Sequence, residues 1–189
     1  MIDNVQSNQT AESFFAEAMS VGDDKHRAIL LEQALQLDNK FADAYLELGR
    51  CYLKLKKFKK AESLLKTAIS LDDDGWGHLY LGNLFFTKEN WNAAEIEFRK
   101  GKQILSDLAV PLWCLADVYR AKGEIKKSEK FYRAAIKLQP TNADSLARLG
   151  RLLLEESRQI EGTKYIKQAL EQDKSCRVAL KWKKQFGIK

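Results

Sequence analysis

Two neighbouring stretches decide the fold of this chain: residues 45–52 read YLELGRCY, and residues 58–71 read FKKAESLLKTAISL. In the first stretch, apolar and small side chains recur at the spacing of one face of an α-helix. Residues 55–57, LKK, interrupt the pattern. The second stretch carries its own apolar stripe at helical spacing, formed by Phe58, Ala61, Leu65, Ala68 and Leu71. The sequence therefore predicts two helices joined by a tight turn.

A Leu-Gly or Leu-Ala pair from the first helix recurs along the chain. The copies are Leu48-Gly49, Leu81-Gly82, Leu115-Ala116 and Leu149-Gly150, at intervals of 33, 34 and 34 residues. A fixed period near 34 is typical of arrays of helix pairs. Glycine costs a helix up to about 1 kcal/mol relative to alanine, so its recurrence favours close crossing of two helices over chance. Such an array predicts a docking surface and not a reaction centre.

These columns resemble the tetratricopeptide repeat family over four full copies, from residue 42 to residue 174. The resemblance implies an all-α fold: a right-handed α-solenoid of stacked antiparallel helix pairs with a C-terminal capping helix. The expected divisions are a disordered N-terminus at 1–8, a degenerate N-terminal repeat at 9–41, repeats at 42–74, 75–108, 109–142 and 143–175, and the capping helix at 176–187. The fourth copy departs most from the family pattern, at Gln159, Gly162 and Gln172, so we expect it to be the loosest.

Composition places the chain among soluble helical proteins, with 45% hydrophobic and 31% charged residues and only two prolines. No run approaches the roughly 18 apolar residues that cross a bilayer. The first residues have neither the basic nor the apolar part of a secretory signal. Cys51, Cys114 and Cys176 are widely spaced and odd in number, which favours reduced thiols. We therefore expect a cytoplasmic protein without a membrane span.

No arrangement of residues supports catalysis. His26 and His78 are far apart, and His78 falls in a helix-packing column, which favours a core histidine with satisfied hydrogen bonds. The cysteines lack C-x-x-C spacing, and the paired carboxylates fall at turns or helix ends. We therefore expect no enzyme activity, no cofactor and no metal site.

In the tetratricopeptide repeat family, the first helices of the repeats line a concave groove that binds peptides. Once the packing columns are set aside, the remaining positions on these helices define a candidate peptide-binding groove. Its residues are Leu46, Arg50, Leu53, Trp76, Leu79, Asn83, Phe86, Trp113, Asp117, Arg120, Arg148 and Arg151. Exposed apolar clusters usually mark interaction sites, and Trp and Arg are frequent hot-spot residues. The competing interpretation is that the aromatic residues pack against a neighbouring repeat or the terminal helix.

The arginines give this groove a positive bias, and guanidinium groups suit carboxylates through paired hydrogen bonds. Our hypothesis is an adaptor or scaffold that binds an extended or helical protein segment with apolar anchors and some acidic residues. One branch of the family clamps the C-terminal carboxylate of chaperones. Of the five positions that correspond to this clamp, only Asn83 and Arg148 fit, so we do not expect a chaperone clamp.

Two alternatives remain open. The net charge of +6 could direct lysine-rich faces to nucleic acid or to another anionic surface. The groove lacks the polar pair in every repeat that a base-reading protein needs, which makes nucleic acid the weaker interpretation. Self-association is the other alternative: a terminal helix or tail would lie in the groove of a second copy and form a homo-oligomer.

Overall fold

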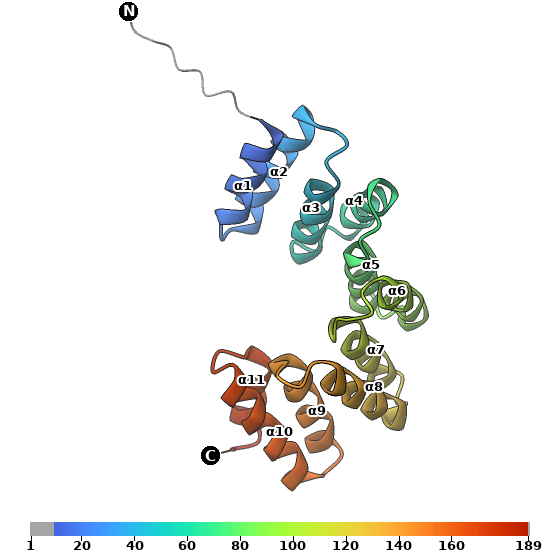
Figure 1. Cartoon of the computed structure of the whole chain (residues 1–189), viewed down its shortest axis with the longest axis vertical. Helices are drawn as coiled ribbons and strands as arrows, with labels where there is room; N and C mark the ends of the chain where they lie inside the picture. Colours follow the sequence, from blue (N-terminus) through green and yellow to red (C-terminus); the bar gives the residue numbers. More distant parts are fainter. Residues whose placement is uncertain (1–9, 189) are drawn as a thin grey trace, which may run out of the picture. The chain divides into compact units, whose positions relative to one another are not determined.

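The computed structural model describes residues 10–188, so the expected disordered N-terminus at 1–8 lies outside the described residues. Within that range the chain forms helices and no strand (Figure 1). The predicted all-α class of stacked helix pairs is confirmed. The chain divides into two compact units, Met1–Leu84 and Phe85–Lys189.

The first unit begins with two helix pairs that pack in chain order, each helix against the next. Its helices are α1 (Ala11–Ser20), α2 (Asp24–Leu37), α3 (Ala42–Lys54), α4 (Phe58–Leu71) and most of α5 (Trp76–Thr87). Arg27 of α2 occupies a column where the repeat pattern has a small residue. Its guanidinium donates to the carbonyl of Ala18, at 3.1 Å, and to that of Val21. The large side chain therefore satisfies carbonyl groups at the C-terminal end of α1, where a cation is favourable.

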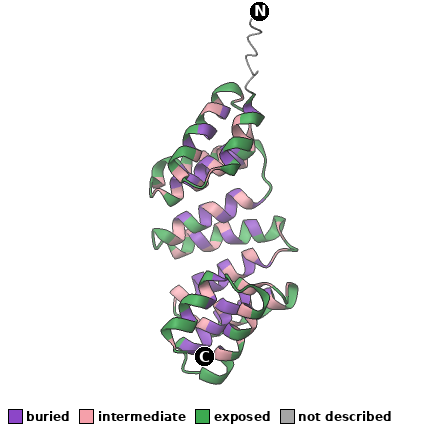
Figure 2. Cartoon of the chain, turned by 90° about the vertical axis from the view of Figure 1, so that its left-hand side faces the viewer, coloured by how far each residue is buried: buried purple, intermediate pink, exposed green. Residues whose placement is uncertain are grey.

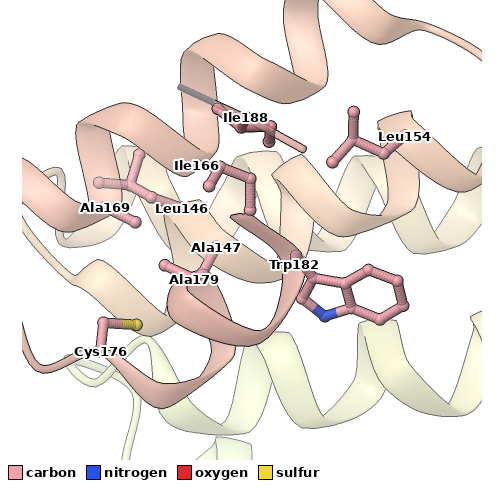
Figure 3. Close-up of a cluster of buried hydrophobic side chains, with 9 residues drawn as sticks. All are labelled: Leu146, Ala147, Leu154, Ile166, Ala169, Cys176, Ala179, Trp182 and Ile188. Atoms are coloured by element: carbon pink, nitrogen blue, oxygen red, sulfur yellow. The ribbon is translucent and has the colours of Figure 1, made fainter. Parts of the chain in front are cut away.

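The second unit contains α6 (Trp91–Ile104), α7 (Val110–Ala121), α8 (Ile125–Leu138), α9 (Ala143–Glu155), α10 (Gln159–Gln172) and α11 (Arg177–Gln185). Helices α6 to α10 again pack in chain order, and α11 packs against both α9 and α10. In Figure 2, buried residues lie where neighbouring helices face one another. Figure 3 shows the core at the C-terminal end, where Ala179 and Trp182 of α11 join Leu146, Ala147 and Ile166.

Glycine lets the helices of the last pair approach one another closely, and the expectation that this repeat is the loosest stays a prediction. A Cβ added to Gly162 of α10 would lie 2.6 Å from Cγ of Leu154 and 2.9 Å from the carbonyl oxygen of Gly150. Real Cβ contacts are essentially never under 3.0 Å. The departure at Gly162 therefore brings α10 nearer to α9. In the α7–α8 pair, Ser128 fills the same column, and its hydroxyl donates to the carbonyl of Ala116 at 2.8 Å.

The turns inside four helix pairs share one backbone device. A residue with positive φ follows each first helix: Lys56 (58°), Glu89 (58°), Gly123 (76°) and Ser157 (62°). At the first turn, the N–H of Lys56 donates to the carbonyl of Leu53 at 3.0 Å, and that of Lys57 to Tyr52 at 2.8 Å. This pair of bonds is the Schellman motif, whose left-handed residue is usually glycine. Only one of these four turns has glycine there.

Lys56→Gly is expected to raise the free energy of unfolding by up to about 1 kcal/mol. A side chain in the left-handed region costs roughly 1–2 kcal/mol, and glycine removes this cost while losing somewhat more entropy on folding. The lysine side chain is exposed, so little contact is lost. Urea denaturation measures the change. Gly123→Ala, the reverse substitution at the corresponding turn, should destabilise; if neither variant shifts the transition midpoint, the turns are not strained.

A carboxylate links α6 to α7 and the turn after it. Glu95 of α6 accepts hydrogen bonds from Lys122 at 2.6 Å, from the Tyr119 hydroxyl at 2.7 Å and from Arg99 at 2.9 Å. Burial alone would raise the pKa of Glu95, but these three donors outweigh it and lower the pKa to about 2. The Glu95 carboxylate is thus more stable ionised in the folded chain than in the unfolded one.

This linkage predicts a specific loss of stability in acid. The Glu95 pKa falls on folding from an ordinary 4.5 to about 2, so its contribution is fully present above pH 4.5. That contribution is lost as the pH falls from 4.5 towards 2. Glu95→Gln should therefore lower the free energy of unfolding at neutral pH and flatten its decline in acid. Glu171→Gln, on an exposed position of α10, is the control and should keep the wild-type slope. Equal slopes for Glu95→Gln and wild type would contradict the linkage.

Candidate functional site

The predicted groove residues are divided between the two units. Leu46, Arg50, Leu53, Trp76, Leu79 and Asn83 lie in the first unit, and Phe86, Trp113, Asp117, Arg120, Arg148 and Arg151 lie in the second. The second unit brings the last five of these together. Phe86 instead packs edge-on against Trp91 of α6, with 4.9 Å between the ring centroids.

In the first unit the predicted residues offer little free charge. Arg50 donates from Nε and Nη2 to Glu47 on its own helix, at 2.7 and 2.5 Å. The expected positive bias is therefore neutralised here by a residue that the sequence analysis did not include. Trp76 packs near Tyr80, Leu79 is 4% exposed, and Asn83 is exposed.

In the second unit the predicted site is centred on Asp117 of α7. This residue is 8% exposed, and its carboxylate accepts from the hydroxyl of Tyr132 at 2.5 Å, from Arg151 at 2.7 Å and from Arg148. Burial and the Asp117 charge raise the pKa of Tyr132, so this hydroxyl stays protonated and donates. Burial opposes the charge on Arg151, but Asp117, Tyr132 and Glu155 outweigh it and raise its pKa. Asp117 thus holds two guanidinium groups from α9 against α7.

Two tryptophans complete the arrangement. The guanidinium carbon of Arg148 lies 3.8 Å from the ring centroid of Trp113, and that of Arg151 lies 5.8 Å from the ring of Trp182. Both contacts are cation–π interactions, which are worth about 0.5–2 kcal/mol depending on burial. Trp182 belongs to α11, is only 9% exposed and packs in the core at the C-terminal end, so it supports Arg151 without being part of the surface. The partly exposed side chains of α7 and α9 form the surface, which we call the arginine–tryptophan face and define by Trp113, Arg120, Arg148 and Arg151.

Among the three arginines of the face, Arg120 makes the weakest contacts to carboxylates. Its nearest carboxylate oxygens are those of Asp117, 3.9 Å from Nε, and of Glu155, 3.6 Å from Nη1. Both distances exceed a hydrogen bond. The Nε atoms of Arg120, Arg148 and Arg151, and Nε1 of Trp113, are buried without an acceptor. An unsatisfied buried donor typically costs about 1–3 kcal/mol. The face therefore has donors in excess of acceptors.

Sequence reasoning missed three residues at this site: Tyr132, Glu155 and Trp182. Tyr132 stood in a packing column that holds Leu65, Phe98 and Ile166 in other repeats. Its hydroxyl, absent from those three, was the available signal. Neither Glu155 nor Trp182 is among the candidate groove residues predicted from the sequence. The i, i+4 spacing of Arg151 and Glu155 was a local signal for one ion pair, but no local pattern pairs Glu155 with Arg120 or Trp182 with Arg151.

The described residues give no support for covalent or metal chemistry. All three cysteines are free and buried, and burial raises the pKa of each thiol. Within residues 10–188, no cluster of three or more potential metal ligands is present. His78 is 7% exposed, with Nε2 3.2 Å from Asp73, as expected for a core histidine with a satisfied hydrogen bond. Among the described helices, none is both long and apolar enough to cross a membrane.

Three family models described as tetratricopeptide repeat match this chain, over residues 29–80, 109–142 and 131–163. Together they cover more than half of it. The chain belongs to the tetratricopeptide repeat family. Folds of this family are typically non-catalytic interaction modules, and membership supports a role as a protein-interaction scaffold.

Two curated proteins resemble the chain in sequence. It is 25% identical over 131 residues to the BBSome complex member BBS4 of Bos taurus. This alignment covers 68% of the chain and 25% of BBS4. It is 26% identical over 157 residues to the protein O-mannosyl-transferase TMTC3 of Homo sapiens. This alignment covers 80% of the chain and 17% of TMTC3. The chain thus spans a quarter or less of the length of these relatives.

Solved structures show the same fold. A thermophilic tetratricopeptide repeat protein from Thermus thermophilus has a TM-score of 0.82 at 19% identity, covering 94% of this chain and 99% of its own. MamA gives 0.65 at 23% identity, covering 84% and 93%. YrrB, described as having an unusual peptide-binding site, gives 0.60 at 18% identity, covering 92% of each chain.

Proposed function

We propose that this chain is a non-catalytic adaptor that binds a segment of another protein on the arginine–tryptophan face of its second unit. The observation that carries the proposal is the gathering of three guanidinium groups and Trp113 around one buried carboxylate. Tryptophan and arginine are among the residues most enriched in binding hot spots. Holding their side chains in place before binding lowers the entropy lost on association.

Several observations support a protein partner over chemistry on a small molecule. The thiols are buried and their pKa values are raised, so they are poor nucleophiles. The arginine–tryptophan face itself combines charged and aromatic side chains and contains no nucleophile. By its name, one relative is a member of the BBSome complex. We further propose a cytoplasmic location, which the three free cysteines support.

The alternative function, binding to an anionic surface through the lysines, is weaker than the net charge alone implies. Lys122 is held by Glu95 at 2.6 Å, and Lys127 pairs with Glu124. Lys57 and Lys60 lie over the ring of Tyr52, at 5.2 and 5.3 Å from its centroid. Part of the lysine excess is therefore engaged within the fold.

The double variant Trp113→Ala/Arg120→Ala tests the proposal. Peptides selected from a displayed random library on the wild-type protein should bind the variant at least about tenfold more weakly, because two hot-spot side chains are removed. Isothermal titration calorimetry measures both affinities. The same titration at about 50 and 200 mM salt tests the alternative, because the affinity for a phosphate-bearing partner would fall by orders of magnitude over this range.

A matched control separates loss of binding from loss of fold. Ile160→Ala/Arg133→Ala changes exposed side chains of α10 and α8, and should leave affinity unchanged. Circular dichroism must show both double variants folded at the assay temperature. Wild-type affinity in the folded Trp113/Arg120 variant would reject this face as the binding site.

A further inference from the structure

We infer that the arginine–tryptophan face selects an acidic side chain of the partner segment, and that Arg120 is the residue that determines this preference. The inference rests on the proposed function, since it names the chemistry of the residue received at that site. It depends on how the three arginines divide their hydrogen-bonding capacity.

Arg148 and Arg151 are already committed. Each donates to Asp117, and each lies over a tryptophan ring. Their side chains are 19% and 13% exposed. Asp117 is fixed in turn by the fully buried Tyr132. These contacts hold both guanidinium groups in one orientation and leave them little freedom to follow a ligand.

Arg120 differs from both. Its side chain is 28% exposed, the most of the three, and it makes no hydrogen bond to a described residue. Its Nη1 and Nη2 make no hydrogen bond within residues 10–188 and, unlike Nε, are not buried, and the carboxylate oxygen of Glu155 is 3.6 Å from Nη1. A guanidinium presents five N–H donors in a planar fork that matches both oxygens of a carboxylate. Arg120 therefore has an unused capacity that an incoming carboxylate would fill.

The charges favour one carboxylate. Within this ion-pair network, three guanidinium groups (Arg120, Arg148 and Arg151) pair with two carboxylates (Asp117 and Glu155), which leaves one positive charge in excess in the network. A single Glu or Asp side chain balances it. A phosphate carries about two negative charges, and beside Asp117 and Glu155 it would meet like-charge repulsion. The preferred occupant is therefore an acidic side chain of an unmodified protein segment.

Three matched sets of short, end-blocked peptides test this assignment. All contain Leu, Phe and Ala as apolar anchors, and the central residue is Glu, Gln or phosphoserine. Wild-type protein should bind the Glu set about tenfold more tightly than the Gln set, and phosphoserine should bring no gain over Glu. In Arg120→Gln the Glu preference should fall to near unity while the apolar peptides still bind. Arg133→Gln, an exposed arginine of α8 paired with Glu129, should keep the wild-type preference.

The outcomes distinguish a failure of the acidic preference from a failure of the proposed binding function. Equal binding of the Glu and Gln sets, or a Glu preference that survives Arg120→Gln, overturns the acidic assignment and leaves the apolar binding face in place. A preference for phosphoserine over Glu also overturns it. If none of the sets binds the wild-type protein, the inference and the proposed function both fail.

Discussion

Asp117→Ala should lower the free energy of unfolding by about 3 kcal/mol, the largest effect we expect from one polar substitution. Removal of one partner from a buried ion pair typically costs 3–5 kcal/mol, because the remaining charge stays buried without compensation. Here the loss leaves Arg148 and Arg151 without their shared carboxylate and the Tyr132 hydroxyl without its acceptor. The arginines retain some solvent contact, so the lower end of the range applies. Urea denaturation of the two proteins measures the difference.

A double-mutant cycle tests whether this loss comes from the cluster. Asp117→Ala and Arg148→Ala should couple by at least about 1 kcal/mol, because residues of one ion-pair network are not additive. Glu171→Ala, on the exposed side of α10, should change stability by no more than about 0.5 kcal/mol. Additive effects at Asp117 and Arg148 would show that the carboxylate does not hold the guanidinium in solution.

Gly162→Ala should lower the free energy of unfolding by about 2 kcal/mol, within the cost of overpacking a filled interior. The added methyl group would meet Cγ of Leu154 at 2.6 Å and the Gly150 carbonyl oxygen at 2.9 Å. Leucine can rotate away, but a backbone oxygen can move only if α10 shifts from α9. Alanine favours the helix by up to about 1 kcal/mol, which offsets only part of this strain. Thermal or urea unfolding provides the measurement.

Gly22→Ala is the matched control for this substitution. A Cβ there meets no atom within 4 Å, and its φ lies outside the range where a side chain is strained. The expected change is neutral or slightly stabilising, since alanine restricts the unfolded chain. A Gly162→Ala protein as stable as wild type would mean that α9 and α10 are not in close contact and that the repeat is loose, as the sequence had indicated.

The periodic columns of the sequence predicted the helix pairs because each repeat meets the same packing requirement. The Leu-Gly and Leu-Ala pairs, 33 or 34 residues apart, indicate where helices cross, and α3 with α4 and α9 with α10 are two of the resulting helix pairs. The strained turn residues were not predicted. Glycine usually marks a left-handed residue after a helix, and the sequence has Lys56, Glu89 and Ser157 at three of these positions instead. The Schellman hydrogen bonds hold these residues in the left-handed region despite their side chains.

The candidate site was predicted only in part. Helix spacing placed Trp113, Asp117, Arg120 and Arg151 on one side of their helices, and the structure brings them together with Arg148. Spacing could not indicate that Asp117 is buried and already bound to two arginines, because such pairing depends on side chains 31 and 34 residues away. Arg50 is a different case, because Glu47 lies three residues away on the same helix and neutralises it, and this i, i+3 spacing could have predicted the pair.

Site-specific photo-crosslinking tests most directly whether the second unit grips a protein segment with its arginine–tryptophan face. A benzoylphenylalanine at position 155, an exposed position at the end of α9 beside Arg120, is compared with one at position 160 on α10, where Ile160 is 90% exposed. With a library-selected peptide at saturating concentration, we expect a covalent adduct from position 155 and little from position 160. Adducts from position 160 alone, or equal adducts from both positions, would contradict binding at this face.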